Sequence, residues 1–196
     1  MIRTPLALIL YLIAAVAVAA GLLWHAGDSF SGANRATGEA SVGGPFSLTD
    51  QDGRGRRADD FRGRFMLVYF GYSYCPDICP TTLAVMADAL EKLGPEAERI
   101  VPIFITIDPE RDTSRVLRAY LKAFGPRFVG LTGNAKAVAA AAHAWRVYYR
   151  KRPLGGGYAV DHSSYIYLMG ADGKFIAIFN ETLGPDGLAQ ALKRQI

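Results

Sequence analysis

The sequence predicts an α/β fold, a central mixed sheet flanked by helices, that follows an N-terminal transmembrane helix. Apolar runs typical of buried strands alternate with amphipathic runs over most of the chain, as expected where helices join parallel strands. An uncharged run of about nineteen residues near the N-terminus is just long enough to cross a bilayer. The only two cysteines, Cys75 and Cys79, lie where a strand-like run meets a helix-like run, so we expect the chemistry of the domain at that junction.

Residues 1–25 are predicted to be a membrane anchor or signal segment. No charge interrupts residues 6–24, whereas a helix at the surface of a soluble core would have a polar face. Arg3 precedes the run and Asp28 follows it, so the amino end should stay in the cytoplasm while the rest of the chain is exported. Small residues around Ala19 would suit cleavage, but the apolar run continues beyond them, which favours a retained anchor.

The rest of the chain divides into a tether and one domain. Residues 26–41 are rich in Gly, Ser, Ala and Asn and show no periodicity, which is typical of a flexible tether. Residues 42–196 are enough to bury one core of their own. The net charge of +4 and the pI near 9.1 come from basic residues interspersed with acidic ones, so we expect a solvated surface and no nucleic-acid partner.

The strands are predicted from apolar runs and turn signals. Residues 65–72 and 100–107 are almost wholly apolar, as strands covered on both faces are. Asp-Gly pairs at 52–53 and 172–173 mark hairpin turns. The expected strands are a short hairpin at 45–57, buried strands at 65–72 and 100–107, a short strand at 128–131, and a closing hairpin at 165–169 and 175–179.

The helices are predicted from apolar residues at helical spacing and from their end signals. Pro80 suits the first position of a helix, and a Gly-Pro pair at 94–95 stops it. The basic residues 150–152 suit the negative end of the dipole of a preceding alanine-rich helix. The expected helices are 80–93, 114–124, 135–149 and 186–193.

This order of elements resembles the thioredoxin fold. In that fold, cysteines at a helix start face a loop that leads into the closing hairpin, and here that loop carries His162. The other two histidines suit surface or structural positions, since His25 borders the membrane segment and His143 lies within the alanine-rich helix. His162 is therefore the histidine that we expect beside the thiols.

A thiol pair at a helix start has two chemical uses. Free N–H groups and the positive end of the helix dipole favour thiolate over thiol there. Two thiolates can close into a disulfide and exchange it, or they can hold a soft metal. A purely structural disulfide is disfavoured, because a loop over only three intervening residues constrains the unfolded chain very little.

Two thiolates and one imidazole form a soft ligand set, and the predicted metal ligands are Cys75, Cys79 and His162. Such a set suits Cu(I), and with an added oxygen it suits Cu(II), whereas Zn(II) prefers a fourth protein ligand. Asp77 or Asp161 could supply that oxygen, and a hydrogen bond from the imidazole to Asp161 would fix its tautomer. A turn residue is an equally good interpretation of Asp161.

Three segments carry a family resemblance. They are GYSYCPDICP (71–80), TIDPERDT (106–113) and YAVDHSSYIYLMGADG (158–173). Together they resemble the Sco/SenC family, membrane-tethered thioredoxin-like copper carriers of cytochrome c oxidase assembly. The resemblance implies that Cys75, Cys79 and His162 bind Cu(I) or Cu(II), and that the protein delivers copper to the binuclear copper site of the oxidase or reduces the thiols of that site. Tyr74 stands where family members often have histidine, which removes an auxiliary ligand.

The same resemblance implies partners and a location. The main partner is the copper-site subunit of cytochrome c oxidase, and another periplasmic copper chaperone and a thiol reductant are further candidates. The chain would be a single-pass protein of the inner (cytoplasmic) membrane with its domain on the periplasmic side. In a eukaryote it would lie in the mitochondrial inner membrane and face the intermembrane space.

The main alternative is a thiol–disulfide oxidoreductase or redox sensor, in which Cys75 attacks and Cys79 resolves. The helix-start position agrees with it, but three residues separate the cysteines where two are usual, and His162 faces them. A peroxidase would need a peroxidatic pocket that no motif identifies, and an assembly factor that acts only through its surface would need neither thiol. We therefore predict primarily a metallochaperone and leave thiol–disulfide reductase activity open.

Overall fold

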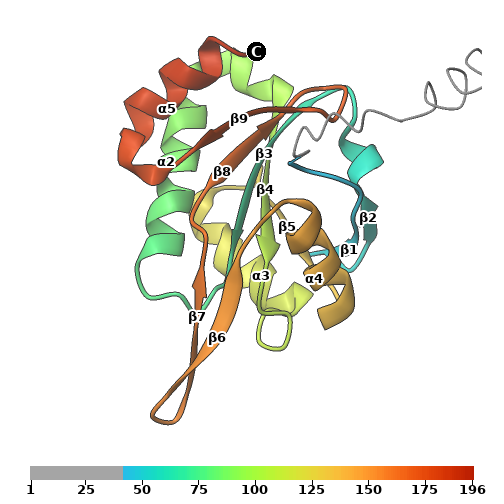
Figure 1. The fold of residues 1–196 in the computed structure, drawn as a ribbon. Coiled ribbons are helices and arrows are strands. Elements are labelled where there is room, and N and C mark those ends of the chain that lie inside the picture. The colour runs from blue at the N-terminus through green and yellow to red at the C-terminus, as the bar shows by residue number, and fades with distance from the viewer. Residues whose placement is uncertain (1–41) are drawn as a thin grey trace, which may run out of the picture. The chain divides into compact units, whose positions relative to one another are not determined.

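A computed structural model describes residues 42–196, and Figure 1 shows their arrangement. Within this part of the chain, seven strands form a mixed sheet in the order β2-β1-β5-β4-β3-β8-β9. These strands are β1 (Ser47–Asp50), β2 (Gly55–Arg57), β3 (Phe65–Gly71), β4 (Ile100–Thr106), β5 (Val129–Thr132), β8 (Ile166–Met169) and β9 (Phe175–Phe179). The helices are α2 (Ile78–Leu93), α3 (Ser114–Leu121), α4 (Ala135–Ala144) and α5 (Gly184–Lys193). Short 3₁₀ turns lie at Ala58–Phe61, Gly94–Arg99, Lys122–Phe124 and Glu181–Leu183.

The predicted anchor (1–25) and tether (26–41) lie outside the described residues. No helix within residues 42–196 combines the length and the apolar character needed to cross a membrane. The α/β class predicted for the domain is confirmed, with helices on a mixed sheet.

The centre of the sheet is parallel and buried. β4 pairs in parallel with both β3 and β5, whereas β3 pairs with β8 in the antiparallel sense. Every residue of β4 is buried, so its apolar sequence suits a strand covered on both faces. The strand continues through Pro102, which lies opposite Leu67. Both hairpins predicted from Asp-Gly pairs are confirmed, as β1-β2 and β8-β9.

Helices cover both faces of the sheet, and the two faces are distinguished by successive residues of β3. Tyr69 meets Cys79 of α2, whereas Phe70 points to the other face and meets Trp145, which directly follows α4. Trp145 is fully buried, and its ring centroid lies 5.7 Å from that of Tyr167. α5 packs beside α2 (Figure 1). The thiol pair therefore lies on the α2 face, opposite the cluster around Trp145.

The helix predicted at 135–149 is shorter than expected. α4 ends at Ala144, and Arg146 has a left-handed backbone with φ of 58°. β6 (Tyr149–Leu154) follows and pairs with β7 (Gly157–His162) as a two-stranded ribbon that is separate from the main sheet. The alanines stop at the end of α4, and the valine and tyrosines that come next favour strands.

This ribbon corrects two predictions. The basic residues 150–152 lie on β6 and not at the end of a helix. The loop predicted to carry His162 is strand β7, and His162 is its last residue. In Figure 1 the ribbon extends beyond the end of the sheet where β3 leads into α2. Its root therefore lies beside the cysteine loop.

Candidate metal centre

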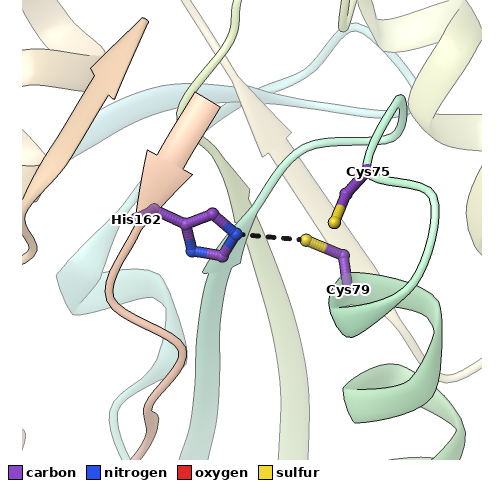
Figure 2. Close-up of side chains that lie close together, drawn as sticks. All are labelled: Cys75, Cys79 and His162. Atoms are coloured by element: carbon purple, nitrogen blue, oxygen red, sulfur yellow. Dashed lines mark hydrogen bonds between the residues drawn. The ribbon is translucent and has the colours of Figure 1, made fainter. Parts of the chain in front are cut away.

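Three side chains from separate elements meet at the end of β3, as Figure 2 shows. Cys75 lies in the loop after β3, Cys79 in the first turn of α2, and His162 at the end of β7. One ligand atom from each residue, two sulfur atoms and one ring nitrogen, lies within 4.8 Å of the others. Both cysteines are free thiols, Cys79 is fully buried, and Cys75 is 9% exposed. The structure thus brings together the three residues that the sequence singles out.

The cysteine loop is short because a buried strand runs almost directly into a helix. β3 ends at Gly71, and α2 begins at Ile78, two residues before the start predicted at Pro80. Pro80 is tolerated there because the N–H groups of the first turn have no partner within the helix. The Cys75 N–H donates to the Tyr72 carbonyl at 3.2 Å, which turns the loop back towards the helix. The thiol pair therefore faces the positive end of the α2 dipole.

The orientation of His162 leaves one ring nitrogen free for the sulfur atoms. Its Nδ1 lies 2.9 Å from the Ser163 carbonyl oxygen, which can only accept a hydrogen bond, so Nδ1 carries the proton. Nε2 consequently has a lone pair, and it lies 3.4 Å from Cys79 Sγ. Metal-binding histidines typically donate their second N–H to a protein acceptor in this way. The prediction that Asp161 fixes the tautomer is wrong, because the Ser163 carbonyl does so.

The two carboxylates considered as oxygen donors or outer partners lie at the rim of the site. Asp77 and Asp161 are both exposed. Asp161 accepts a hydrogen bond from Arg152 Nε at 3.3 Å, and Asp77 accepts one from Thr81 Oγ1 at 3.5 Å. Neither belongs to the group of three ligand atoms that the described residues bring together.

The pKa values of the two thiols shift in opposite directions because the thiols lie close together. Interaction with the nearby Cys79 thiol lowers the pKa of Cys75 well below its ordinary value. The same interaction, together with burial, raises the pKa of Cys79. The opposite pKa directions, and the deeper burial of Cys79, favour a reduced pair that shares one proton, with the proton held on Cys79. A metal that binds both sulfur atoms has to displace this proton.

Aromatic rings close the site on the inner side and leave it open on the other. Tyr69 Oη lies 3.6 Å from Cys79 Sγ. The rings of Tyr69 and Tyr72 approach the imidazole of His162 edge-on, with centroids 6.3 and 5.9 Å away. An open hollow of about 650 Å³ reaches Cys75 and His162 from outside. An incoming ligand can therefore approach Cys75 while Cys79 stays shielded.

Gly71 lies at a position beneath Cys79 where a side chain has no room. A Cβ atom there would lie 2.8 Å from Cys79 Sγ and 3.0 Å from ring carbons of Tyr69 and Phe104. We expect Gly71→Ala to displace the Cys79 sulfur, to weaken Cu(I) binding about tenfold, and to lower the free energy of unfolding by about 1–3 kcal/mol. Chelator competition and chemical denaturation measure the two effects. Gly155→Ala, at a glycine with open space around it, is the control, and equal Cu(I) affinities of the two variants would contradict the prediction.

The segment 106–113 supports the site, a role that no pattern in the sequence predicts. Asp108 and Asp112 within it are both fully buried. Asp112 accepts hydrogen bonds from Ser73 in the cysteine loop, and Asp108 accepts one from Tyr158 of β7. Two acidic residues soon after a buried strand are a weak signal for such a role, because they suit exposed turn positions as well as a buried, hydrogen-bonded carboxylate.

The fold and the site together define a class of protein, a thioredoxin-like domain in which a thiol pair at a helix start faces a histidine. A family model described as SCO1/SenC matches residues 34–196, and the chain belongs to this family.

Relatives and solved structures agree with this assignment. The chain is 41% identical to the SCO2-like protein of Rickettsia felis over 157 residues, which are 78% of this chain and 76% of that protein. It spans less than two thirds of the length of its mitochondrial SCO1 and SCO2 relatives from human and mouse. The structure of Bradyrhizobium japonicum ScoI with copper bound matches with a TM-score of 0.75 at 41% identity, over 80% of this chain and 100% of that chain. BsSco, a member of the Sco family of cytochrome c oxidase assembly proteins in which a disulfide switch is identified, matches with a TM-score of 0.64 at 26% identity, over 78% of this chain and 92% of that chain.

Proposed function

We propose that this chain is a copper carrier for cytochrome c oxidase assembly that binds Cu(I) or Cu(II) through Cys75, Cys79 and His162. The observation that carries the proposal is the convergence of two sulfur atoms and one ring nitrogen within 4.8 Å. Two sulfur atoms and one nitrogen form a soft set that suits Cu(I). Copper-bound ScoI and the description of BsSco as an oxidase assembly protein support the same function.

A carrier must release its metal as well as bind it. Three protein ligands leave the cargo with an open coordination position, and the hollow gives a client ligand access to that position. An incoming thiolate or imidazole can then share the metal and displace the donor ligands one by one. We expect Cys75 to leave first, because it borders the hollow while Cys79 is fully buried.

The proposal extends to location and partners. Residues 1–25 would anchor the chain in the inner membrane, and residues 26–41 would let the domain reach its client on the periplasmic or intermembrane-space side. The client would be the copper-site subunit of cytochrome c oxidase, and another copper chaperone would supply the metal. A thiol reductant would keep the cysteine pair in the state that binds copper.

Thiol–disulfide exchange is the second candidate function, and the acidity of Cys75 favours it. The lowered pKa of Cys75 gives a thiolate that borders the hollow, while the Cys79 thiol lies behind it as a resolving group. The two functions can coexist, because each uses the reduced pair. The measured affinity for Cu(I) distinguishes them, because tight binding favours the carrier function and weak binding favours thiol–disulfide exchange.

Anaerobic titration of the reduced chain with Cu(I), in competition with a chromophoric chelator, tests the carrier function. We expect the wild-type protein to bind one Cu(I) tightly and the Cys75→Ser/Cys79→Ser double variant to bind none, because the variant lacks both sulfur ligands. Circular dichroism checks that the double variant is folded. Weak binding by the wild-type protein would assign the pair to thiol–disulfide exchange instead.

A further inference from the structure

We propose that residues 108–112 form a positioning segment that holds His162 and the cysteine loop at their ligand distances. This inference rests on the proposed function and deepens it. No side chain of the segment belongs to the ligand group, so any effect on copper has to pass through other residues. The segment has two arms, one to β7 and one to the cysteine loop.

The first arm fixes β7, the strand that ends in His162. Asp108 accepts hydrogen bonds from Arg111 Nε and, at 2.8 Å, from Tyr158 Oη. Arg111 Nη1 donates to the Tyr158 carbonyl at 3.0 Å, and its guanidinium carbon lies 3.9 Å from the centroid of the Tyr158 ring. Tyr158 is thus held through its hydroxyl, its ring and its backbone. It precedes His162 by four residues on the same strand, and an even separation places both on one face of β7.

β7 needs this external support because the ribbon has little stability of its own. Among the described residues it pairs only with β6, and an isolated two-stranded ribbon is marginally stable in water. One further bond, from the Val160 N–H to Tyr72 Oη at 3.3 Å, joins β7 to the chain that leads into the cysteine loop. The contacts of Tyr158 therefore anchor the strand that carries His162.

The second arm fixes the cysteine loop. Asp112 accepts hydrogen bonds from the Ser73 N–H at 3.0 Å and from the Ser73 hydroxyl at 2.5 Å. It also accepts one from Thr106 Oγ1 of β4 at 2.7 Å. Ser73 lies two residues before Cys75, so the end of β4 and the start of the cysteine loop share one buried carboxylate.

The two arms meet in one compact turn. The Asp112 N–H donates to the Asp108 carbonyl at 2.9 Å, and the Thr132 hydroxyl of β5 donates to the Asp112 carbonyl at 2.7 Å. Both carboxylates are fully buried, where an unpaired charge would be strongly unfavourable. Hydrogen bonds to Thr106 of β4 and Thr132 of β5 fix this segment on two central strands. It can therefore hold both His162 and the cysteine loop in fixed positions.

Tyr158→Phe tests the first arm, because it removes the hydroxyl bond to Asp108 and keeps the ring. We expect Cu(I) binding by the reduced full chain to weaken about tenfold, as is typical when an outer support of a metal site is lost. In a His162→Ala background the same substitution should change Cu(I) affinity less than about twofold, because the group that it positions is already gone. Tyr148→Phe, at an exposed tyrosine just before β6, is the matched control and should bind Cu(I) as the wild type does.

Comparison of the Cu(I) affinities with and without His162 separates an effect on the position of His162 from a general loss of stability. Ser73→Ala acts on the cysteine loop, so it should weaken Cu(I) binding in both backgrounds. Wild-type affinity for Tyr158→Phe, or an equal loss with and without His162, would overturn the first arm. Should Tyr158→Phe lower the melting temperature, Arg111→Lys repeats the test, since it keeps the charge but loses the bond to the Tyr158 carbonyl.

Hydrogen exchange tests the same role without copper. In the metal-free reduced chain, Tyr158→Phe should accelerate exchange of the β7 amides and leave the β3 amides unchanged. Unchanged β7 exchange would overturn the positioning role even if Cu(I) binds tightly. Absence of Cu(I) binding by the wild type together with faster β7 exchange would overturn the proposed function and leave the positioning of His162 standing.

Discussion

Oxidation of Cys75 and Cys79 to a disulfide is expected to abolish tight Cu(I) binding, and reduction is expected to restore it. The disulfide consumes both thiolates and leaves His162 as the remaining member of the ligand set, and a single imidazole is a poor site for Cu(I). The two sulfur atoms lie within 4.8 Å of each other on neighbouring parts of one loop and helix start, so the bond requires only local movement. The measurement is a Cu(I) titration of the chain after treatment with diamide and desalting, repeated after reduction.

A cysteine variant provides the control for this experiment. Cys75→Ser cannot form the intramolecular disulfide, so diamide should leave its residual copper binding unchanged. Mass spectrometry after alkylation confirms that the wild-type chain is fully oxidised. Tight binding retained by the oxidised chain would show that ligands other than the two thiols hold the metal.

Because the two sulfur atoms differ in exposure, oxidation and ligand exchange are both expected to start at Cys75. Cys75 has the lowered pKa and borders the hollow, so an oxidant or an incoming client ligand is expected to meet it first. Cys79 is buried behind it, with Tyr69 Oη at 3.6 Å. If the chain is the proposed copper carrier, release of copper and formation of the disulfide would therefore begin at the same atom. A client that takes the metal leaves the reduced pair behind, whereas an oxidant leaves a site that must be reduced before it can load again.

The strands, the cysteine helix and the three converging residues could be predicted because their signals are local or follow from a known fold. β3 and β4 are continuous apolar runs, and the cysteines directly follow one of them. His162 stands out because His25 borders the predicted anchor and His143 lies within an alanine-rich helix. The helix prediction fails beyond Ala144, because β6 is stabilised by pairing with β7, a contact between segments that local helical spacing does not report.

The support of the site could not be predicted, because it consists of contacts between distant segments. The acceptor for His162 Nδ1 is the Ser163 carbonyl. Every residue has a backbone carbonyl, so the sequence cannot show which one accepts this bond. Asp108 and Asp112 could equally have been exposed turn residues, and only burial reveals that they must be hydrogen-bonded. Gly71 is required by the sulfur atom of a residue eight positions later, a restriction that appears once α2 lies over β3.

His162→Ala is expected to weaken Cu(I) binding by at least about 100-fold, because a directly bonded ligand should matter more than the outer supports whose loss costs about 10–100-fold. The protonated Nδ1 leaves the lone pair of Nε2 directed at the thiol pair, 3.4 Å from Cys79 Sγ, so the imidazole is ready to bind without reorientation. The variant keeps both thiols, and its remaining affinity measures what two sulfur atoms achieve alone.

Competition titration under anaerobic conditions measures this loss, with His143→Ala as the matched control. His143 is exposed on α4, so its removal should change Cu(I) affinity less than about twofold. If both histidine variants bind Cu(I) as the wild type does, the metal is held by the thiols alone, and the facing histidine is not a copper ligand. If His162→Ala alone loses affinity while its disulfide still forms and reduces normally, copper binding and thiol exchange are separable properties of one site, and the histidine is what makes a thioredoxin-like thiol pair into a copper carrier.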